Sequence, residues 1–213
     1  MLVANIMDTS YYIDPNAEMF SQAFKNFYQN HFVDSYGLSR REVDISFFKT
    51  MTDEEREVAR RLVRYNLKLR QVHLFQAAGE LKDEQALPIL YEQLNNNTDL
   101  SWRLSIGQAI WKINGDEMYL QLLRNLQNHP NGTMKAAHFE QVTDFKNNES
   151  IEMLFEYLDD PDNFVRHLAL SKLNYLCTGM HALEHRFDRI YFLKRRKNET
   201  FKRELLRNLQ NLF

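Results

Sequence analysis

The chain has 213 residues, of which 44% are hydrophobic and 13% aromatic, a composition that excludes a disordered protein and fits one with a folded core. Its net charge of −2 offers no overall attraction for nucleic acid, and its single cysteine excludes an intramolecular disulfide framework and a multi-cysteine zinc site. Gly and Pro are few while Leu, Glu, Arg, Lys and Gln are common, which favours helix over strand. We find no apolar window long enough to cross a bilayer and no leader-like start, so we expect a cytoplasmic, all-α protein.

The first quarter of the chain predicts helices that do not follow the pattern of the rest. One helix is predicted over residues 16–32, with phenylalanines and His31 on a single face. The tetrapeptides SRRE from Ser39 and TDEE from Thr52 both have the form of a capping box and predict two further helices. We interpret residues 1–68 as an N-terminal helical cap or as a degenerate first repeat.

The helix that follows Thr52 carries a basic stripe, defined by side chains that recur every four residues with no acid on the same line: Arg56, Arg60, Arg64 and Lys68. Such a stripe could hold the phosphates of a nucleic acid or an acidic face of a partner protein. More often a stripe of this kind is a solvated face, or it pairs with acids on a neighbouring helix. The sequence leaves these alternatives open.

An internal repeat of about 32 residues organises residues 69–177. Three amphipathic segments begin 32 residues apart, at Glu84, Asp116 and Asn148. Each places two leucines on one helical face: Leu90 and Leu94, Leu122 and Leu126, Leu154 and Leu158. After a short polar link, a second helix is marked by an apolar residue and then a base. These markers are Leu69-Arg70, Trp102-Arg103, Met134-Lys135 and Val165-Arg166.

The fourth marker lies in the segment DDPDNFVRHLALSKL, which resembles the short bacterial form of the HEAT-like repeat family. The matching positions are Asp160-Pro161, Val165-Arg166, Ala169 and Leu173. The second unit has Ile106 where the family has a small residue, and the third, with Ala137 or His138 there, matches less well. The resemblance covers about residues 70–177. It implies a right-handed α-α superhelix, a solenoid of antiparallel helix pairs, and it implies no particular activity.

Residues 178–213 are predicted to form an inserted helix and a C-terminal capping helix continuous with the array. The heptapeptide LLRNLQN occurs at residues 122–128 and again at 205–211, so we interpret both copies as ends of the first helix of a unit; chance repetition is the alternative. The motif HALEH, from His181 to His185, has the spacing of a metalloprotease helix. Such a segment is more commonly an ordinary exposed or packed helix, and we predict no metal site.

The second helices are expected to present a concave, partner-binding face once their apolar positions are assigned to the core. That face is predicted to comprise Phe75, Gln108, Trp111, Glu140, Thr143, His167, Ser171 and Asn174. An error of one residue in this count would move Phe75 and Trp111 into the core.

We therefore predict a non-enzymatic helical-repeat protein that binds a macromolecule, favouring a protein partner, through this concave face. We find no Gly-rich phosphate loop and no serine elbow, and we predict no catalytic residue and no cofactor. One alternative is a nucleic-acid-binding protein related in fold to the alkylpurine DNA glycosylases, which would use the basic stripe and residues 194–197. A resemblance to bilin lyases with related repeats rests on fold analogy alone.

Overall fold

The computed structural model describes residues 13–14, 17–33, 46–69, 71–179 and 186–211. These residues form helices and turns and contain no strand, which confirms the all-α prediction for this part of the chain. The chain divides into two compact units, Met1–Tyr119 and Leu120–Phe213, with the division inside one helix. The domain limits predicted from the sequence, after residues 68 and 177, stay predictions.

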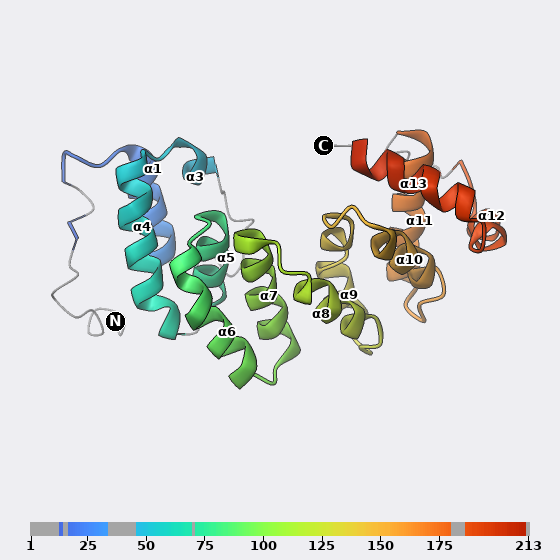
Figure 1. Cartoon of the computed structure of the whole chain (residues 1–213), viewed down its shortest axis with the longest axis horizontal. Coiled ribbons are helices and arrows are strands. Elements are labelled where there is room, and N and C mark those ends of the chain that lie inside the picture. Colours follow the sequence, from blue (N-terminus) through green and yellow to red (C-terminus); the bar gives the residue numbers. More distant parts are fainter. Residues whose placement is uncertain (1–12, 15–16, 34–45, 70, 180–185, 212–213) are drawn as a thin grey trace. The chain divides into compact units, whose positions relative to one another are not determined.

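The helices of each unit follow one another in pairs (Figure 1). The N-terminal unit contains α1 (Gln22–Tyr28), the π-helical turn η2 (Gln29–Val33), α3 (Ser46–Thr50), α4 (Asp53–Asn66), η3 (Leu67–Leu69), α5 (Val72–Glu80), η4 (Glu84–Ala86), α6 (Leu87–Asn96) and α7 (Leu100–Asn114). Helix α8 (Met118–Gln127) contains the division. The C-terminal unit continues with α9 (Gly132–Ala137), η5 (Glu140–Thr143), α10 (Asn148–Tyr157), α11 (Asn163–Thr178), α12 (Arg189–Arg195) and α13 (Glu199–Asn211).

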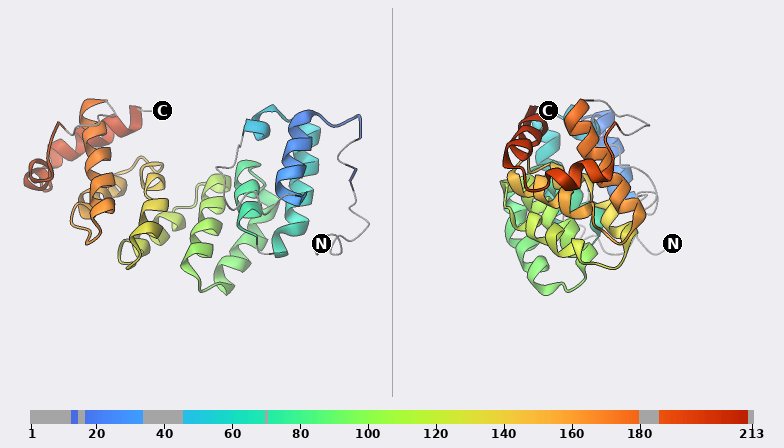
Figure 2. Two further views of the ribbon diagram at one scale, coloured as in Figure 1. Left: turned by 180° about the vertical axis from the view of Figure 1, so that it is seen from behind. Right: turned by 90° about the vertical axis from the view of Figure 1, so that its right-hand side faces the viewer.

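The start of α4 has the predicted capping box. The Thr52 hydroxyl accepts a hydrogen bond from the Glu55 amide, and the Glu55 carboxylate accepts one from the Thr52 amide. The same carboxylate accepts two bonds from Ser21, at 2.6 Å from its amide and 3.0 Å from its hydroxyl. One buried acid therefore joins the starts of α1 and α4, which lie side by side (Figures 1 and 2).

Helix α1 begins at Gln22, later than predicted. The Ser21 side chain caps this end by accepting a bond from the Phe24 amide, and residues 17–20 form a turn instead of a helical entry. The predicted apolar face is buried at Phe24 and Phe27 of α1 and continues at the buried His31 of η2. The capping box predicted at Ser39 lies outside the described residues, as does the HALEH motif.

The predicted leucine pairs are buried in all three units of the repeat. The six side chains have exposed fractions of 3% or less: Leu90, Leu94, Leu122, Leu126, Leu154 and Leu158. In each case the two leucines lie on the buried face of the first helix of a helix pair, in or directly after its last turns. Because this burial recurs in successive helix pairs, the 32-residue period is visible in the sequence.

Two of the four bases that mark the second helices have a common structural role, while Arg70 lies outside the described residues. Arg103 donates a hydrogen bond to the carbonyl oxygen of Asn97, and Arg166 donates one to that of Asp160, in both cases six residues earlier. Each guanidinium thereby closes the link between the two helices of a pair, where carbonyl groups lack a helical partner. Lys135 differs, because its ammonium group is buried and lies 2.5 Å from the Asp160 carboxylate of the next pair.

Contacts that span one repeat period occur within both units. In the N-terminal unit, Lys112 of α7 pairs with Glu80 of α5, a separation of 32 residues. In the C-terminal unit, contacts at the same separation join Arg124 to Glu156 at 3.2 Å, Lys172 to Glu140 at 3.0 Å, and the Asn208 amide group to the Leu176 carbonyl at 2.8 Å. Equivalent positions of successive helix pairs thus lie next to each other inside each unit.

Helices α5 and α7 show how closely such equivalent helices pack. Phe75 makes an edge-on contact with the Trp102 ring, and one turn further along Gly79 faces Ala109. A Cβ atom at Gly79 would lie 3.2 Å from the Ala109 Cα, so the absence of a side chain permits this approach. The two helices therefore run in the same direction.

The two copies of LLRNLQN lie in different settings. Leu122 and Leu126 in α8, and Leu205 and Leu209 in α13, are buried in the same relative positions. Helix α8 precedes the second helix α9, whereas α13 follows the short helix α12 and packs against both α10 and α11. The second copy therefore lies on the last described helix and not at the end of the first helix of a pair; its role as a C-terminal cap stays a prediction.

Candidate protein-interaction groove

A groove of about 640 Å³ opens on the N-terminal unit where α4 and η3 meet η4 and α6. Basic and apolar side chains line it together: Arg61, Arg64, Tyr65, Asn66, Lys68, Leu69, Gln85 and Ile89. This volume lies in the range of sites that receive a ligand or several side chains of a partner. We refer to it as the α4–α6 groove.

One cation of the groove is fixed from within the protein. The Arg64 guanidinium lies 3.2 Å from the carboxylate of Asp83, a residue that is 3% exposed, and it also bonds the Gln85 side chain. Burial raises the pKa of Asp83 above its usual value, while nearby Arg64 acts in the opposite direction. Arg64 therefore joins α4 to η4 and shapes the groove wall.

Two other cations face solvent. The Arg61 side chain is 60% exposed, and its 3.8 Å contact with Glu57 joins two partly exposed groups, so it contributes little to stability. Lys68 is exposed in η3, seven residues after Arg61. Both are therefore accessible to an anionic group that enters the groove.

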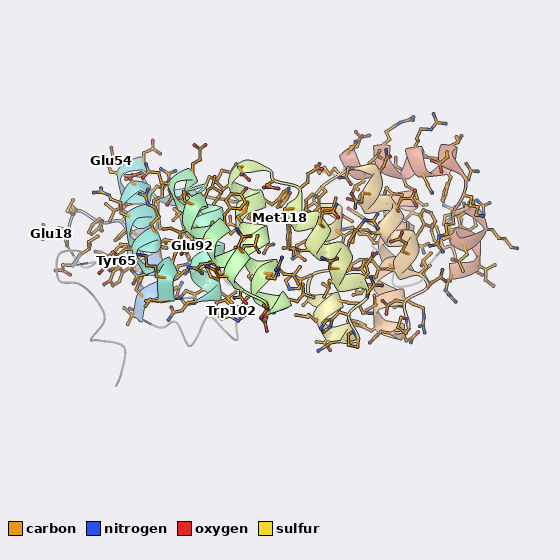
Figure 3. All side chains as sticks on the ribbon, turned by 60° about the horizontal axis from the view of Figure 1, so that its bottom comes forward. Glu18, Glu54, Tyr65, Glu92, Trp102 and Met118 are labelled. Atoms are coloured by element: carbon orange, nitrogen blue, oxygen red, sulfur yellow. The ribbon has the colours of Figure 1, made fainter. Side chains whose placement is uncertain are left out.

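The apolar part of the groove is unusually accessible for side chains of this size. Leu69 is 44% exposed and Tyr65 is 37% exposed, and the partly exposed Ile89 of α6 lies in the same groove. Figure 3 shows Tyr65 at the surface of α4. A partner side chain that covered these groups would remove apolar surface from water and so gain binding free energy.

The predicted basic stripe does not form one free row of cations. Arg56 donates to the carbonyl oxygens of Met51 and Lys49, and Arg60 donates to that of Leu81. With Arg64 bound to Asp83, three of the four members bind the surrounding helix ends and turns, because α4 packs against α3, α5 and η4. Lys68 is the member that stays exposed in the groove.

The sites predicted from the sequence do not include Arg61, Tyr65 and Leu69. These three residues follow one another at intervals of four, on a helical line next to the basic stripe. A search for exposed aromatic and aliphatic residues beside a charged line could have found them.

The predicted concave face is partly buried. In the N-terminal unit Phe75 is 0% exposed, because it packs between α5 and α7 against Trp102; its prediction as an exposed anchor is wrong. Gln108 and Trp111 are partly exposed, and the Trp111 ring lies 6.3 Å from that of Tyr119.

In the C-terminal unit, two further members are buried, so their prediction as surface residues is also wrong. The Thr143 hydroxyl donates to the Glu140 carbonyl at the turn η5. Asn174 holds the chain before α12, since its amide group donates to the Phe187 carbonyl and its oxygen accepts from the Phe187 amide. Glu140 and His167 are exposed, and Ser171 is partly exposed. The predicted face is therefore not a continuous set of accessible residues.

Other chemistry in the described residues is limited. They contain no cluster of three or more potential metal ligands, and no described helix is both long and apolar enough to cross a bilayer. Burial raises the pKa of the Cys177 thiol to about 11, so it is protonated at neutral pH and a poor nucleophile. In the run 194–197, Arg195 stacks on the Tyr191 ring at 3.7 Å and Arg196 pairs with Asp159 at 2.8 Å.

Comparison with known protein-family models, curated proteins and solved structures gave no match for this chain.

Proposed function

We propose that this chain is a non-enzymatic helical-repeat interaction protein that binds a protein partner through the α4–α6 groove. We further propose that its helix pairs belong to a right-handed α-α superhelix of the HEAT-like type. The second proposal is supported by the contacts at a separation of 32 residues and by the shared role of Arg103 and Arg166 in closing a helix pair.

The observation that carries the functional proposal is the composition of the groove. Tyr65 and Leu69 leave apolar surface in contact with water beside the exposed cations Arg61 and Lys68. Interfaces between proteins combine apolar anchors with polar and charged rims in this way. We therefore propose the α4–α6 groove in place of the predicted concave face, where Phe75, Thr143 and Asn174 are buried.

Nucleic acid is the competing ligand for a site that contains cations and an aromatic ring. Phosphate recognition draws on several accessible cations, whereas Arg56, Arg60 and Arg64 are engaged with carbonyl or carboxylate groups of this chain. This engagement favours the protein partner.

The proposal is tested by affinity capture from the cells in which the protein occurs, with the full chain as bait. Replacing both Tyr65 and Leu69 by alanine is expected to reduce recovery of a specific partner strongly, whereas Ile190→Ala, which changes a residue 59% exposed in the C-terminal unit, should not. Circular dichroism checks that each bait is folded. A partner recovered equally with all three baits would exclude the groove as the binding site.

Duplex DNA is titrated in parallel over a range of salt concentrations. We expect no saturable binding. Saturable binding that weakens steeply as salt rises, and that is lost in an Arg61→Glu variant, would replace the proposed function with nucleic-acid recognition.

A further inference from the structure

The structure also indicates what kind of protein segment the groove fits. We infer that the α4–α6 groove binds an acidic peptide segment in which two carboxylates flank a large apolar side chain. This inference rests on the proposed function and deepens it, because it assigns the chemistry of the partner.

The difference between paired and accessible cations in the groove supports an acidic partner. Arg64 already has its counter-ion in the buried Asp83, so it supplies no charge to a ligand. Arg61 shares the partly exposed Glu57 with Arg60 and Arg64, at 3.8 Å, 3.4 Å and 3.6 Å respectively, so its pairing is weak. Lys68 is exposed in η3. The groove therefore presents two cations that an incoming carboxylate can reach without separating a buried ion pair.

The spacing of these two cations limits the ligand. Seven residues separate Arg61 from Lys68, which corresponds to a rise of about 10–11 Å along a helix. In an extended peptide, side chains an even number of residues apart lie on the same face, and those four residues apart are separated by about 13 Å. Two acids four residues apart in an extended segment lie on one face and can thus reach both cations, because the long Arg and Lys side chains span the remaining difference. The residue midway between the two acids faces the groove as well.

The apolar surface lies on the same stretch of helix. Tyr65 follows Arg61 by one turn, and Leu69 directly follows Lys68, with Ile89 of α6 on the other side of the groove. An aromatic or branched aliphatic side chain placed between the two acids would meet Tyr65 while the acids reach the cations. Along the groove a base, an aromatic ring and a second base follow one another. This order matches a peptide that carries an acid, an apolar side chain and a second acid.

A peptide titration tests this match directly. The probe is a fluorescently labelled nine-residue peptide with two glutamates four residues apart and a tryptophan midway between them; the two comparison peptides carry glutamine or lysine in place of the glutamates. Binding to the full-length protein is measured by fluorescence anisotropy at low and at physiological salt. We expect the glutamate peptide to bind at least tenfold more tightly than the glutamine peptide, and the lysine peptide to show no saturable binding.

Charge reversal in the protein provides the matched control. The double variant Arg61→Glu/Lys68→Glu is expected to lose the glutamate peptide and to gain the lysine peptide, whereas Arg203→Glu, at an exposed position of α13, should leave both titrations unchanged. Retention of the glutamate peptide by the double variant would overturn the inference. Circular dichroism of the variants confirms that loss of binding is not loss of fold.

Failure of this inference is distinguishable from failure of the proposed function. If the captured partner is lost with the Tyr65 and Leu69 substitutions but kept with Arg61→Glu/Lys68→Glu, the groove binds a protein whose recognition is not acidic, and only the inference is wrong. If both sets of substitutions leave capture unchanged, the proposed groove function is wrong as well. Saturable binding of an RNA or DNA oligonucleotide that competes with the glutamate peptide would assign the groove to phosphates instead.

Discussion

Replacement of Lys135 by methionine tests the most buried charge contact of the C-terminal unit. The Lys135 and Asp160 side chains are 2% and 3% exposed, and their charged atoms lie 2.5 Å apart. Methionine keeps most of the apolar stem but leaves the Asp160 carboxylate in a buried site without its counter-ion. Breaking a buried pair in this way costs about 3–5 kcal/mol of the free energy of unfolding.

A second substitution separates the effect of the pair from that of packing. In Asp160→Asn the side-chain oxygen can still accept the bond from the Asp162 amide, now at 2.8 Å, while the negative charge is removed. Alone, this change leaves the Lys135 ammonium group buried and unpaired, so it should also be strongly destabilising. Combined with Lys135→Met, it should cost less than the sum of the two single changes, with a coupling free energy of about 2 kcal/mol or more.

Urea unfolding followed by far-ultraviolet circular dichroism gives these free energies for the four proteins. Hydrogen–deuterium exchange measured on peptides from α9 and α11 shows whether the loss of stability is located where the pair lies. A cost below about 1 kcal/mol for Lys135→Met, with no faster exchange in α9, would mean that the pair is accessible to water and that the reasoning is wrong.

Three further predictions concern individual positions. In Gly132→Ala the new Cβ would lie 1.8 Å from an Asp162 carboxylate oxygen, so this capping side chain must move; we expect a loss of about 1–3 kcal/mol, measured by urea unfolding. Burial, reinforced by nearby His73, lowers the pKa of His31 to about 3, so below pH 6.5 the unfolded chain binds a proton that the folded chain excludes. The free energy of unfolding should therefore fall by up to about 1.4 kcal/mol per pH unit as the pH decreases from 6.5 towards 3. This dependence is measured as the unfolding midpoint against pH, and it should be smaller in His31→Phe. Burial opposes ionisation of Glu55, but its hydrogen bonds with Ser21 and Thr52 hold its pKa below the usual value. Glu55→Gln should therefore destabilise the N-terminal unit by about 1–3 kcal/mol at pH 7. The loss should be smaller near pH 3, because protonation removes this contribution from the unmodified protein as well. An unchanged midpoint for Gly132→Ala, a flat pH profile for the unmodified protein, or equal stability of Glu55→Gln at pH 7 would each contradict the geometry on which it is based.

The sequence predicted those features that depend on local chemistry and on the period. The capping box at Thr52 required only two residues three positions apart, and the buried leucines such as Leu90 and Leu122 required only helical periodicity. Both signals act within one helix, so they are readable without knowledge of which helices meet.

The candidate site was predicted less well because it depends on contacts between helices. Phe75 was expected on the surface, but Gly79, one turn later, lets α7 approach α5 closely enough to cover it. Arg64 was recognised as basic, yet its counter-ion Asp83 lies 19 residues further along the chain, in a turn whose direction the sequence pattern does not specify.

The ion pairs that span one period also explain why the repeats look so little alike. Glu80 faces Lys112, and Glu140 faces Lys172, at the same offset along the chain. Identical residues at two such positions would place like charges next to each other, so the equivalent positions carry opposite charges in both cases. Contacts of this kind favour differences between neighbouring helix pairs at the positions where they meet, whereas the buried leucines are free to stay alike.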